Sequence, residues 1–235
     1  MNATPNEHIV KSFDTELARL TGEIVRMGEI AVSQLEASMD VLERRDSRAA
    51  ERVINNDDAI DVLEDTVSQD VVKLLVMRSP VARDLREVLA ALRIASDIER
   101  IGDYAANIAK RSVALNLAPP VAPARGLPAL AALACDLVRE VIAAYATRDA
   151  VRAVEARARD AELDTLYTGL FRELLTYMME DPRQITSCTH LLFMGKNIER
   201  IGDHATNIAE NIWFLVNGNE AMPAREKRDF TTLPV

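Results

Sequence analysis

Apolar residues recur along the first part of the chain at steps that alternate mostly between four and three positions. Such spacing keeps side chains on one face of a helix and is typical of long helices that pack in coiled-coil fashion. We therefore predict one amphipathic helix over residues 7–44. Its apolar stripe is formed by Phe13, Leu17, Leu20, Ile24, Met27, Ala31, Leu35, Met39 and Leu42.

Capping residues and prolines divide the rest of the chain into further helices, since Ser, Thr and Asp favour the N-cap and Pro the first helical position. The candidate caps are Asp46 or Ser47, Ser79, Thr147 or Asp149, and Asp181 with Gln184 reaching back to it. The expected helices span about 47–77, 80–115, 128–146, 149–179 and 182–217. Gly218 suits the left-handed conformation of a helix end.

Residues 115–128, LNLAPPVAPARGLP, hold four of the nine prolines, and we expect no helix to cross them. This segment separates a first half, 7–116, from a second half, 126–217, and residues 218–235 form an expected flexible tail. The predicted fold is all-α, with six long helices arranged as two tandem three-helix bundles related by internal duplication.

The duplication is visible in the sequence, because residues 98–109 read IERIGDYAANIA and residues 198–209 read IERIGDHATNIA. Steps of four residues place the polar side chains of each copy on one helix face. Like charges at this spacing repel each other unless a positive group lies between them. Gly102 and Gly202 each cost about 1 kcal/mol relative to Ala. Because this cost occurs twice at matched positions, we predict that another backbone or a bulky cluster approaches closely there. The polar residues are Glu99, Asp103 and Asn107, then Glu199, Asp203 and Asn207.

The second helix of each half carries an acidic pair at the same spacing, Asp57 with Asp61 and Asp160 with Asp164. In an antiparallel hairpin these pairs can face the repeated segments. An all-oxygen set suits hard cations, namely Mg²⁺, Mn²⁺, Ca²⁺ or oxidised iron, with Zn²⁺ or Ni²⁺ as adventitious occupants. The alternative is a metal-free helical protein whose acidic faces are solvated or paired with Arg100 and Arg200.

Composition narrows the function further. The net charge of −9 disfavours nucleic-acid binding, and no apolar run approaches the ~20 residues of a membrane span. We find no signal peptide and expect a cytoplasmic protein, in which Cys135 and Cys188 are buried apolar residues. A di-iron oxidase needs Glu-x-x-His pairs, and no Glu here has His three positions later, so we expect no enzyme.

The motif E-R-I-G-D-x-x-x-N-I, present twice, and TYMMEDPR at residues 176–183 resemble the PhoU family of phosphate-uptake regulators over about residues 8–217. The resemblance implies two three-helix bundles that often form homodimers. It also implies a cytoplasmic negative regulator of the phosphate regulon and of phosphate uptake. Such a protein is an adaptor between the ATPase subunit of the phosphate ABC transporter and a sensor histidine kinase.

Some members of the family bind metal clusters on the bundle surface. By resemblance, the metal motif corresponds to Glu99, Asp103, Glu199 and Asp203. The acidic pairs of the preceding helices correspond to Asp57, Asp61, Asp160 and Asp164, and the following Asn to Asn107 and Asn207.

Overall fold

The structure is a computed structural model that describes residues 5–78 and 80–224. Every regular element in these two ranges is helical, which confirms the predicted all-α class. The α-helices are α1 (Pro5–Arg44), α2 (Ser47–Asn55), α3 (Asp58–Arg78), α4 (Arg83–Leu115), α5 (Leu127–Thr147), α6 (Ala150–Glu180) and α7 (Ile185–Asn217). Two short 3₁₀ turns, η1 (Ala122–Gly126) and η2 (Pro182–Gln184), precede α5 and α7.

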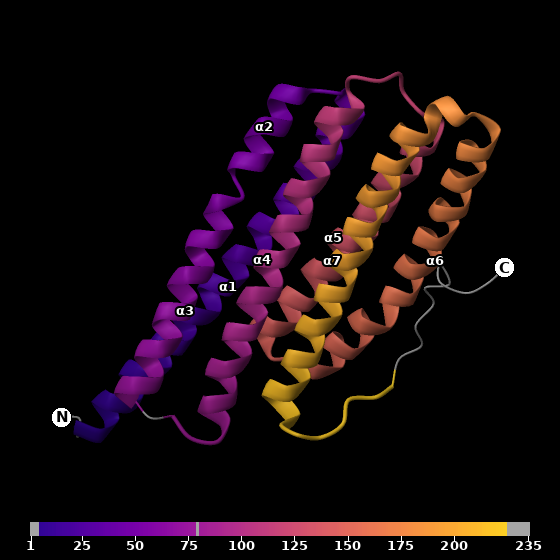
Figure 1. The fold of residues 1–235 in the computed structure, drawn as a ribbon. Helices are drawn as coiled ribbons and strands as arrows, with labels where there is room; N and C mark the ends of the chain where they lie inside the picture. The colour runs from indigo at the N-terminus through magenta and orange to yellow at the C-terminus, as the bar shows by residue number, and fades with distance from the viewer. Residues whose placement is uncertain (1–4, 79, 225–235) are drawn as a thin grey trace.

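The helices lie side by side in two groups (Figure 1). The first group contains α1, α4 and the pair formed by α2 and α3, and the second contains α5, α6 and α7. The groups meet where α4 packs against α7 and where α1 packs against α5. This is the predicted arrangement of two tandem three-helix bundles.

The helices α4 and α7 run antiparallel, so their repeated segments cross near the middle of the molecule. Near one end of the pair, the guanidinium of Arg111 lies 4.3 Å from the ring centroid of Phe193. Near the other end, Arg93 lies 5.4 Å from the ring centroid of Phe214. At the centre, the rings of Tyr104 and His204 are 5.7 Å apart between centroids. The matched residues Tyr104 and His204 therefore face each other across one interface.

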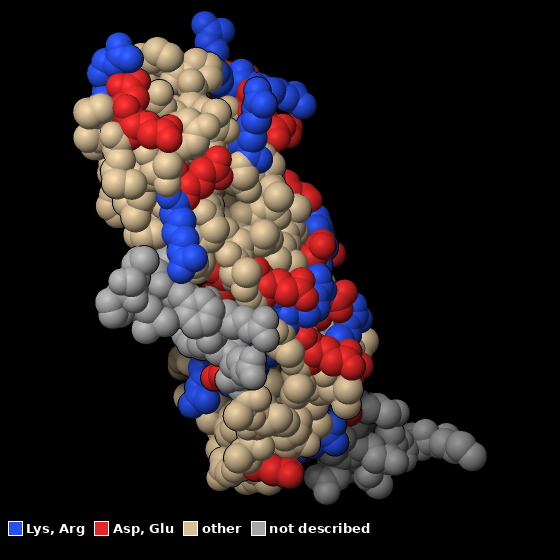
Figure 2. Space-filling view, turned by 90° about the vertical axis from the view of Figure 1, so that its right-hand side faces the viewer, with Lys and Arg blue, Asp and Glu red and all other residues tan. Residues whose placement is uncertain are grey.

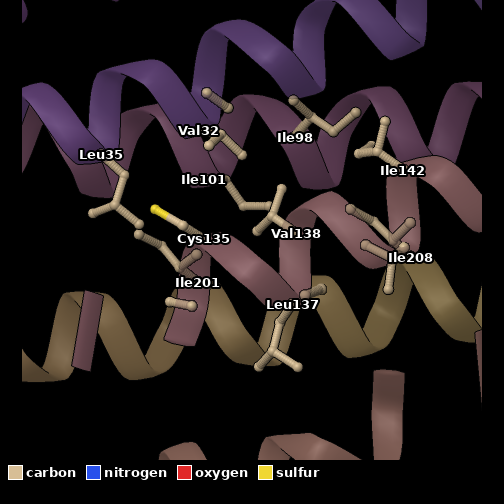
Figure 3. Close-up of a cluster of buried hydrophobic side chains, with 14 of the residues drawn as sticks. Val32, Leu35, Ile98, Ile101, Cys135, Leu137, Val138, Ile142, Ile201 and Ile208 are labelled. Carbon is tan, nitrogen blue, oxygen red and sulfur yellow. The ribbon is translucent and has the colours of Figure 1, made fainter. Parts of the chain in front are cut away.

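One hydrophobic cluster extends through both bundles, with contributions from α1, α3, α4, α5, α6 and α7. Nearly all of the predicted stripe of α1 is buried in it, and Phe13 packs at its margin. Both cysteines are buried and free, as expected. Figure 3 shows part of the cluster, in which α1, α4, α5 and α7 contribute Val32, Leu35, Ile98, Ile101, Cys135, Leu137, Val138, Ile142, Ile201 and Ile208.

The predicted single helix over 47–77 is wrong, because the chain breaks it into α2 and α3 at Asn56 and Asp57. Asn and Asp side chains compete for backbone hydrogen bonds and favour helix ends. The break frees the carbonyl of Val53, which accepts a hydrogen bond at 3.3 Å from Nε2 of the buried Gln34. The corresponding helix of the second half, α6, is continuous.

The predicted start of the third helix is also wrong. Ser79 lies outside the described residues, and α4 begins at Arg83 rather than at Pro80. Ala82 has a φ of 50°, in the left-handed region, so a regular right-handed helix does not run through it. Two other predicted caps are confirmed: Asp46 accepts hydrogen bonds at the start of α2, and Asp149 does so at the start of α6.

Residues 115–128 contain no α-helix between the end of α4 and the start of α5, as predicted. The helix α7 ends at Gly218 as predicted, and Gly218 has a positive φ of 69°. Its ψ of −131° lies outside the predicted left-handed helical conformation, and its N–H donates to the carbonyl of Phe214 at 2.9 Å. Residues 225–235 of the expected tail lie outside the described residues. The bounds proposed for the two bundles, 7–116 and 126–217, stay a prediction.

Charged side chains of both signs are mixed on the side of the molecule where α6 lies (Figure 2). Lys and Arg lie close to Asp and Glu on this face, between broad areas of other residues. The face therefore lacks the extended positive field that phosphate backbones require. Among the described helices, none combines the length and the apolar character needed to cross a membrane.

Candidate functional site

The two glycines of the repeated segment are the points at which the neighbouring helix approaches. A Cβ atom at Gly102 would lie 2.6 Å from Cδ1 of Ile60 and 3.3 Å from Oδ1 of Asp57. A Cβ atom at Gly202 would lie 2.3 Å from Cδ2 of Leu163 and 2.7 Å from Oδ1 of Asp160. The predicted close approach is confirmed, and in both halves the approaching group includes an acidic side chain.

In the first half this packing gathers four predicted residues, Asp57, Asp61, Glu99 and Asp103, which we call the first acidic cluster. Burial raises the pKa of the Asp57 carboxyl, and the negative charges of Asp103 and Asp61 raise it further, against a hydrogen bond from Gln34 that lowers it. Burial and then the charge of Asp103 likewise raise the pKa values of Asp61 and Glu99. The carboxylates are therefore close enough to repel one another.

Basic side chains offset part of this repulsion. The guanidinium of Arg100 lies 3.2 Å from Oδ2 of Asp103 and 3.4 Å from Oε2 of Glu99. The Arg100 side chain is 56% exposed, so these contacts are weak and easily exchanged. The charge of Lys110 also lowers the pKa of Asp57.

The matching residues of the second half, Asp160, Asp164, Glu199 and Asp203, form the second acidic cluster, which is more deeply buried. The side chains of Asp160, Asp164 and Glu199 are buried, whereas Asp61 is exposed and Asp57 and Glu99 are half-buried. Nζ of Lys196 lies 2.6 Å from Oε2 of Glu199. The same ammonium lies 5.4 Å from the ring centroid of Tyr167. The second half thus brings its own cation to its carboxylates.

The two asparagines follow Asp103 and Asp203 by four residues on α4 and α7, and Asn207 lines the same surface pocket as Asp203. Asn107 is exposed on α4. Asn207 donates from Nδ2 to Oδ1 of Asp97 at 3.3 Å, and Nδ1 of His204 lies 2.8 Å from the same oxygen. These contacts join α7 to α4. The sequence analysis did not identify Asp97, because it lies directly before the repeated segment. The available signal is that the matched position of the second copy, Asn197, is also polar.

The donor chemistry of the first acidic cluster fits a hard cation, because its donors are carboxylate oxygens. Burial and the charge of Asp103 raise the pKa values of Asp57, Asp61 and Glu99. Within residues 5–78 and 80–224, however, no three Asp, Glu, His or Cys side chains are placed as ligands of a single ion. Asp61 and Arg100 are both exposed. The ligand role of all ten predicted residues stays a prediction.

Comparison with known proteins places both halves in one family. The PhoU domain matches residues 24–112 and again residues 127–212. The phosphate-specific transport system accessory protein PhoU homolog of Xylella fastidiosa (strain 9a5c) is 61% identical over 232 residues, covering 99% of this chain and 98% of that protein. The homolog of Rhizobium meliloti (strain 1021) is 47% identical over 226 residues, covering 96% of this chain and 95% of its own.

Solved structures agree with this placement. The crystal structure of PhoU from Pseudomonas aeruginosa has a TM-score of 0.84 at 33% identity and covers 88% of this chain and 100% of its own. The phosphate transport system regulatory protein PhoU from Streptococcus pneumoniae has a TM-score of 0.82 at 26% identity, covering 90% of this chain and 100% of its own.

Proposed function

The chain belongs to the PhoU family, and from this premise we propose that it is an accessory protein that regulates phosphate transport. In this proposal it acts in the cytoplasm as a negative regulator of the phosphate regulon and of phosphate uptake. It links the ATPase subunit of a phosphate ABC transporter to a sensor histidine kinase. The observation that carries the proposal is the match to PhoU homologs over nearly the whole chain.

We propose that the protein works by binding and not by catalysis. The family match supports this, because the relatives are named as accessory proteins of a phosphate-specific transport system. Such a regulator can exist in more than one conformation or assembly. A partner that binds one of them more tightly increases the population of that one, by an amount set by the difference in affinity. High phosphate would favour the assembly in which the kinase is held inactive.

Exposed apolar side chains on α3 support a role in binding other proteins. Val72, Val76 and Met77 are 60%, 76% and 63% exposed. Burying apolar side chains of this size stabilises an interface by about 25 cal/mol per Å². A transporter subunit, the kinase or a second copy in a homodimer can each cover them, and sedimentation measures whether a dimer forms.

We further propose that the first acidic cluster binds a hard divalent or trivalent cation through Asp57, Asp61, Glu99 and Asp103. When bound, the cation supplies positive charge that offsets carboxylate repulsion. The part played by the chain is to hold the carboxylates close, which Gly102 permits, and to keep Arg100 at an exposed position from which it can leave. The raised pKa values of Asp57, Asp61 and Glu99 support this proposal.

Deletion of the gene tests the regulatory role. In phosphate-replete cells the deletion should raise phosphatase expression, and a plasmid copy should restore repression. Co-purification from phosphate-rich cells should recover the transporter ATPase and the kinase. Unchanged phosphatase expression in a strain with no second copy of the gene would contradict the regulatory role.

The alternative is a metal-free helical interaction protein whose acidic faces are neutralised internally. The ion pairs of Arg100 and Lys196 favour it. The metal content of untagged protein, measured for the wild type and for Asp103→Ala, distinguishes the metal-binding protein from the metal-free one. An equal metal content in both proteins would remove the ligand assignment.

A further inference from the structure

Beyond the end of α7, the described chain turns back across the second bundle. Gly218 ends the helix with a positive φ, and the segment that follows it runs towards α6 (Figure 1). We call residues 219–224, with the sequence NEAMPA, the strap. Side chains of both α6 and α7 contact the strap.

Three contacts hold the strap, and two of them are made to its backbone. Nε1 of Trp213, on α7, donates a hydrogen bond to the carbonyl of Glu220 at 2.8 Å. Nη1 of Arg157, on α6, donates a hydrogen bond to the carbonyl of Pro223 at 2.8 Å. Between these two carbonyls, the Met222 side chain packs against the hydrophobic core. The surface therefore recognises two backbone carbonyls and one apolar side chain of a non-helical segment.

Arg157 is held in place for this contact by a second partner. Its side chain is only 14% exposed, and its Nη2 atom lies 3.0 Å from Oε1 of Glu210 on α7. Its Nε group donates to the same oxygen at 3.1 Å. This leaves Nη1 for the carbonyl of Pro223, and a hydrogen bond from a charged donor is stronger than one between neutral groups.

The groups that hold the strap belong to the second half alone. The N-caps Asp46 and Asp149 align α2 with α6, and the repeated segments align α4 with α7. The matched positions of the first half carry other residue types, namely Ile54 for Arg157, Lys110 for Glu210 and Val113 for Trp213. After α4, the corresponding chain leads through η1 into α5. Helix packing common to both halves therefore does not account for the three side chains.

The strap also borders a polar surface pocket formed by α6 and α7. Ala224 lines this pocket together with Arg157 and Glu210, and so do Asp203 and Asn207 of the repeated segment. Displacement of the strap would widen the pocket and free both hydrogen-bond donors at once.

We propose that the surface under the strap is a docking site for a short peptide segment of a partner protein, and that the strap occupies this site in the isolated chain. The segment that fits carries an unbranched apolar side chain in the place of Met222. It presents one backbone carbonyl to Trp213 and one to Arg157. The inference depends neither on the cation binding nor on the regulatory role proposed above.

Covalent attachment determines when the strap gives way. A short flexible connection supplies an effective concentration in the millimolar range. A free peptide with the same contacts therefore competes poorly with the strap. A partner protein displaces it by adding contacts elsewhere on the chain.

The test uses the full-length protein, with the indole N–H of its single tryptophan, Trp213, as the reporter in a ¹⁵N NMR spectrum. Met222→Asp releases the strap, because it places a charge where an apolar side chain packs. Met179→Asp changes a methionine of α6 that is 77% exposed and is the matched control. The probe is the synthetic peptide NEAMPA with blocked ends, and NEADPA is its control.

The indole signal should move in Met222→Asp, because the hydrogen bond to the strap is lost, and it should stay in place in Met179→Asp. Added NEAMPA should return the signal of Met222→Asp to the wild-type position, and NEADPA should not. The Kd of NEAMPA should lie at or below the millimolar range, because the attached strap is closed at that effective concentration. An unmoved signal in Met222→Asp, or no effect of NEAMPA up to about 10 mM, would overturn the inference.

A second variant decides the question if Met222→Asp disturbs the helices, which circular dichroism detects. Arg157→Gln removes the charged donor to the carbonyl of Pro223 and should also move the Trp213 signal. Combined with Met222→Asp, it should weaken NEAMPA binding by about tenfold or more, since a hydrogen bond to a charged group is lost. A Trp213 signal that stays at the wild-type position in Arg157→Gln would count against the docking site.

Discussion

Gly102 and Gly202 allow a carboxylate-bearing helix to approach the repeated segment in each half. The space is smaller at Gly202, where the nearest side-chain atom would lie 2.3 Å from an added Cβ, against 2.6 Å at Gly102. At both positions the close neighbours are a branched apolar side chain and an aspartate. The apolar neighbour is Ile60 at Gly102 and Leu163 at Gly202. The glycines therefore determine how near the acidic residues lie to each other.

Gly202→Ala should lower the free energy of unfolding by about 1–3 kcal/mol because it overpacks this contact, although Ala favours the helix. Gly102→Ala should cost less. The matched controls are Gly22→Ala and Gly169→Ala, which have no atom within 4 Å of the added Cβ. These should stabilise the protein by about 0.4–1 kcal/mol. Urea denaturation measures all four, and equal effects at the four sites would contradict the close approach.

Asp61→Asn should stabilise the metal-free protein at pH 7. Burial and the charge of Asp103 raise the pKa of Asp61 in the folded state, so stability falls as pH rises from its ordinary pKa through the folded value. The gain should be about 0.2–0.5 kcal/mol, since Asp61 is exposed and solvent screens it. It should shrink as pH falls towards about 4, because the carboxyl becomes protonated in the folded state first and in the unfolded state only below its ordinary pKa.

The measurement is the urea midpoint at pH 7 and at pH 4 in EDTA, with Asp14→Asn, an exposed change on α1 outside the cluster, as the control. A gain that is the same at both pH values would argue against carboxylate crowding as its cause.

At the scale of the elements, the sequence was sufficient where a local signal decides the structure. The stripe of α1, the caps Asp46 and Asp149 and the end at Gly218 follow from spacing and from single side chains. The break between α2 and α3 did not follow. The break depends on Gln34 of α1, which is distant in sequence. Its Nε2 group donates a hydrogen bond to the freed carbonyl of Val53.

Gln34→Met should therefore destabilise the protein by about 1–3 kcal/mol. It removes the hydrogen bond to the carbonyl of Val53 and the 3.1 Å hydrogen bond to Oδ1 of Asp57. The midpoint of chemical denaturation measures the loss, and Gln69→Met, at an exposed site on α3, is the control. Equal midpoints for the two variants would mean that α1 does not support the break.

At the scale of the whole molecule, the duplication predicted two bundles but not how they join. The join is antiparallel, α4 against α7, and buries residues of both halves in one cluster. The interface includes Asp97 of α4, whose Oδ1 atom contacts Nδ1 of His204 and accepts a hydrogen bond from Nδ2 of Asn207. The hydrophobic periodicity of a single helix cannot predict such a contact, because the contact joins two segments that are far apart in the chain.

A shared core predicts one cooperative unfolding transition. Trp213, the single tryptophan, lies in α7 and reports the second half, whereas circular dichroism reports helices of both halves. The two signals should change at the same urea concentration. A fluorescence transition displaced from the loss of helicity would indicate that the bundles unfold separately.

The two parts of the proposed function, cation binding by the first acidic cluster and binding to the ATPase subunit of a phosphate transporter, make one joint prediction, namely that the cation strengthens binding to the ATPase subunit. The most direct measurement is the Kd for the purified ATPase subunit, for the wild type in Mn²⁺, for the wild type in EDTA and for Asp61→Asn/Asp103→Asn in Mn²⁺. We predict that EDTA and the double substitution each weaken binding by about 5–150-fold, the usual range of coupling between two sites. The same Kd under all three conditions would contradict the account.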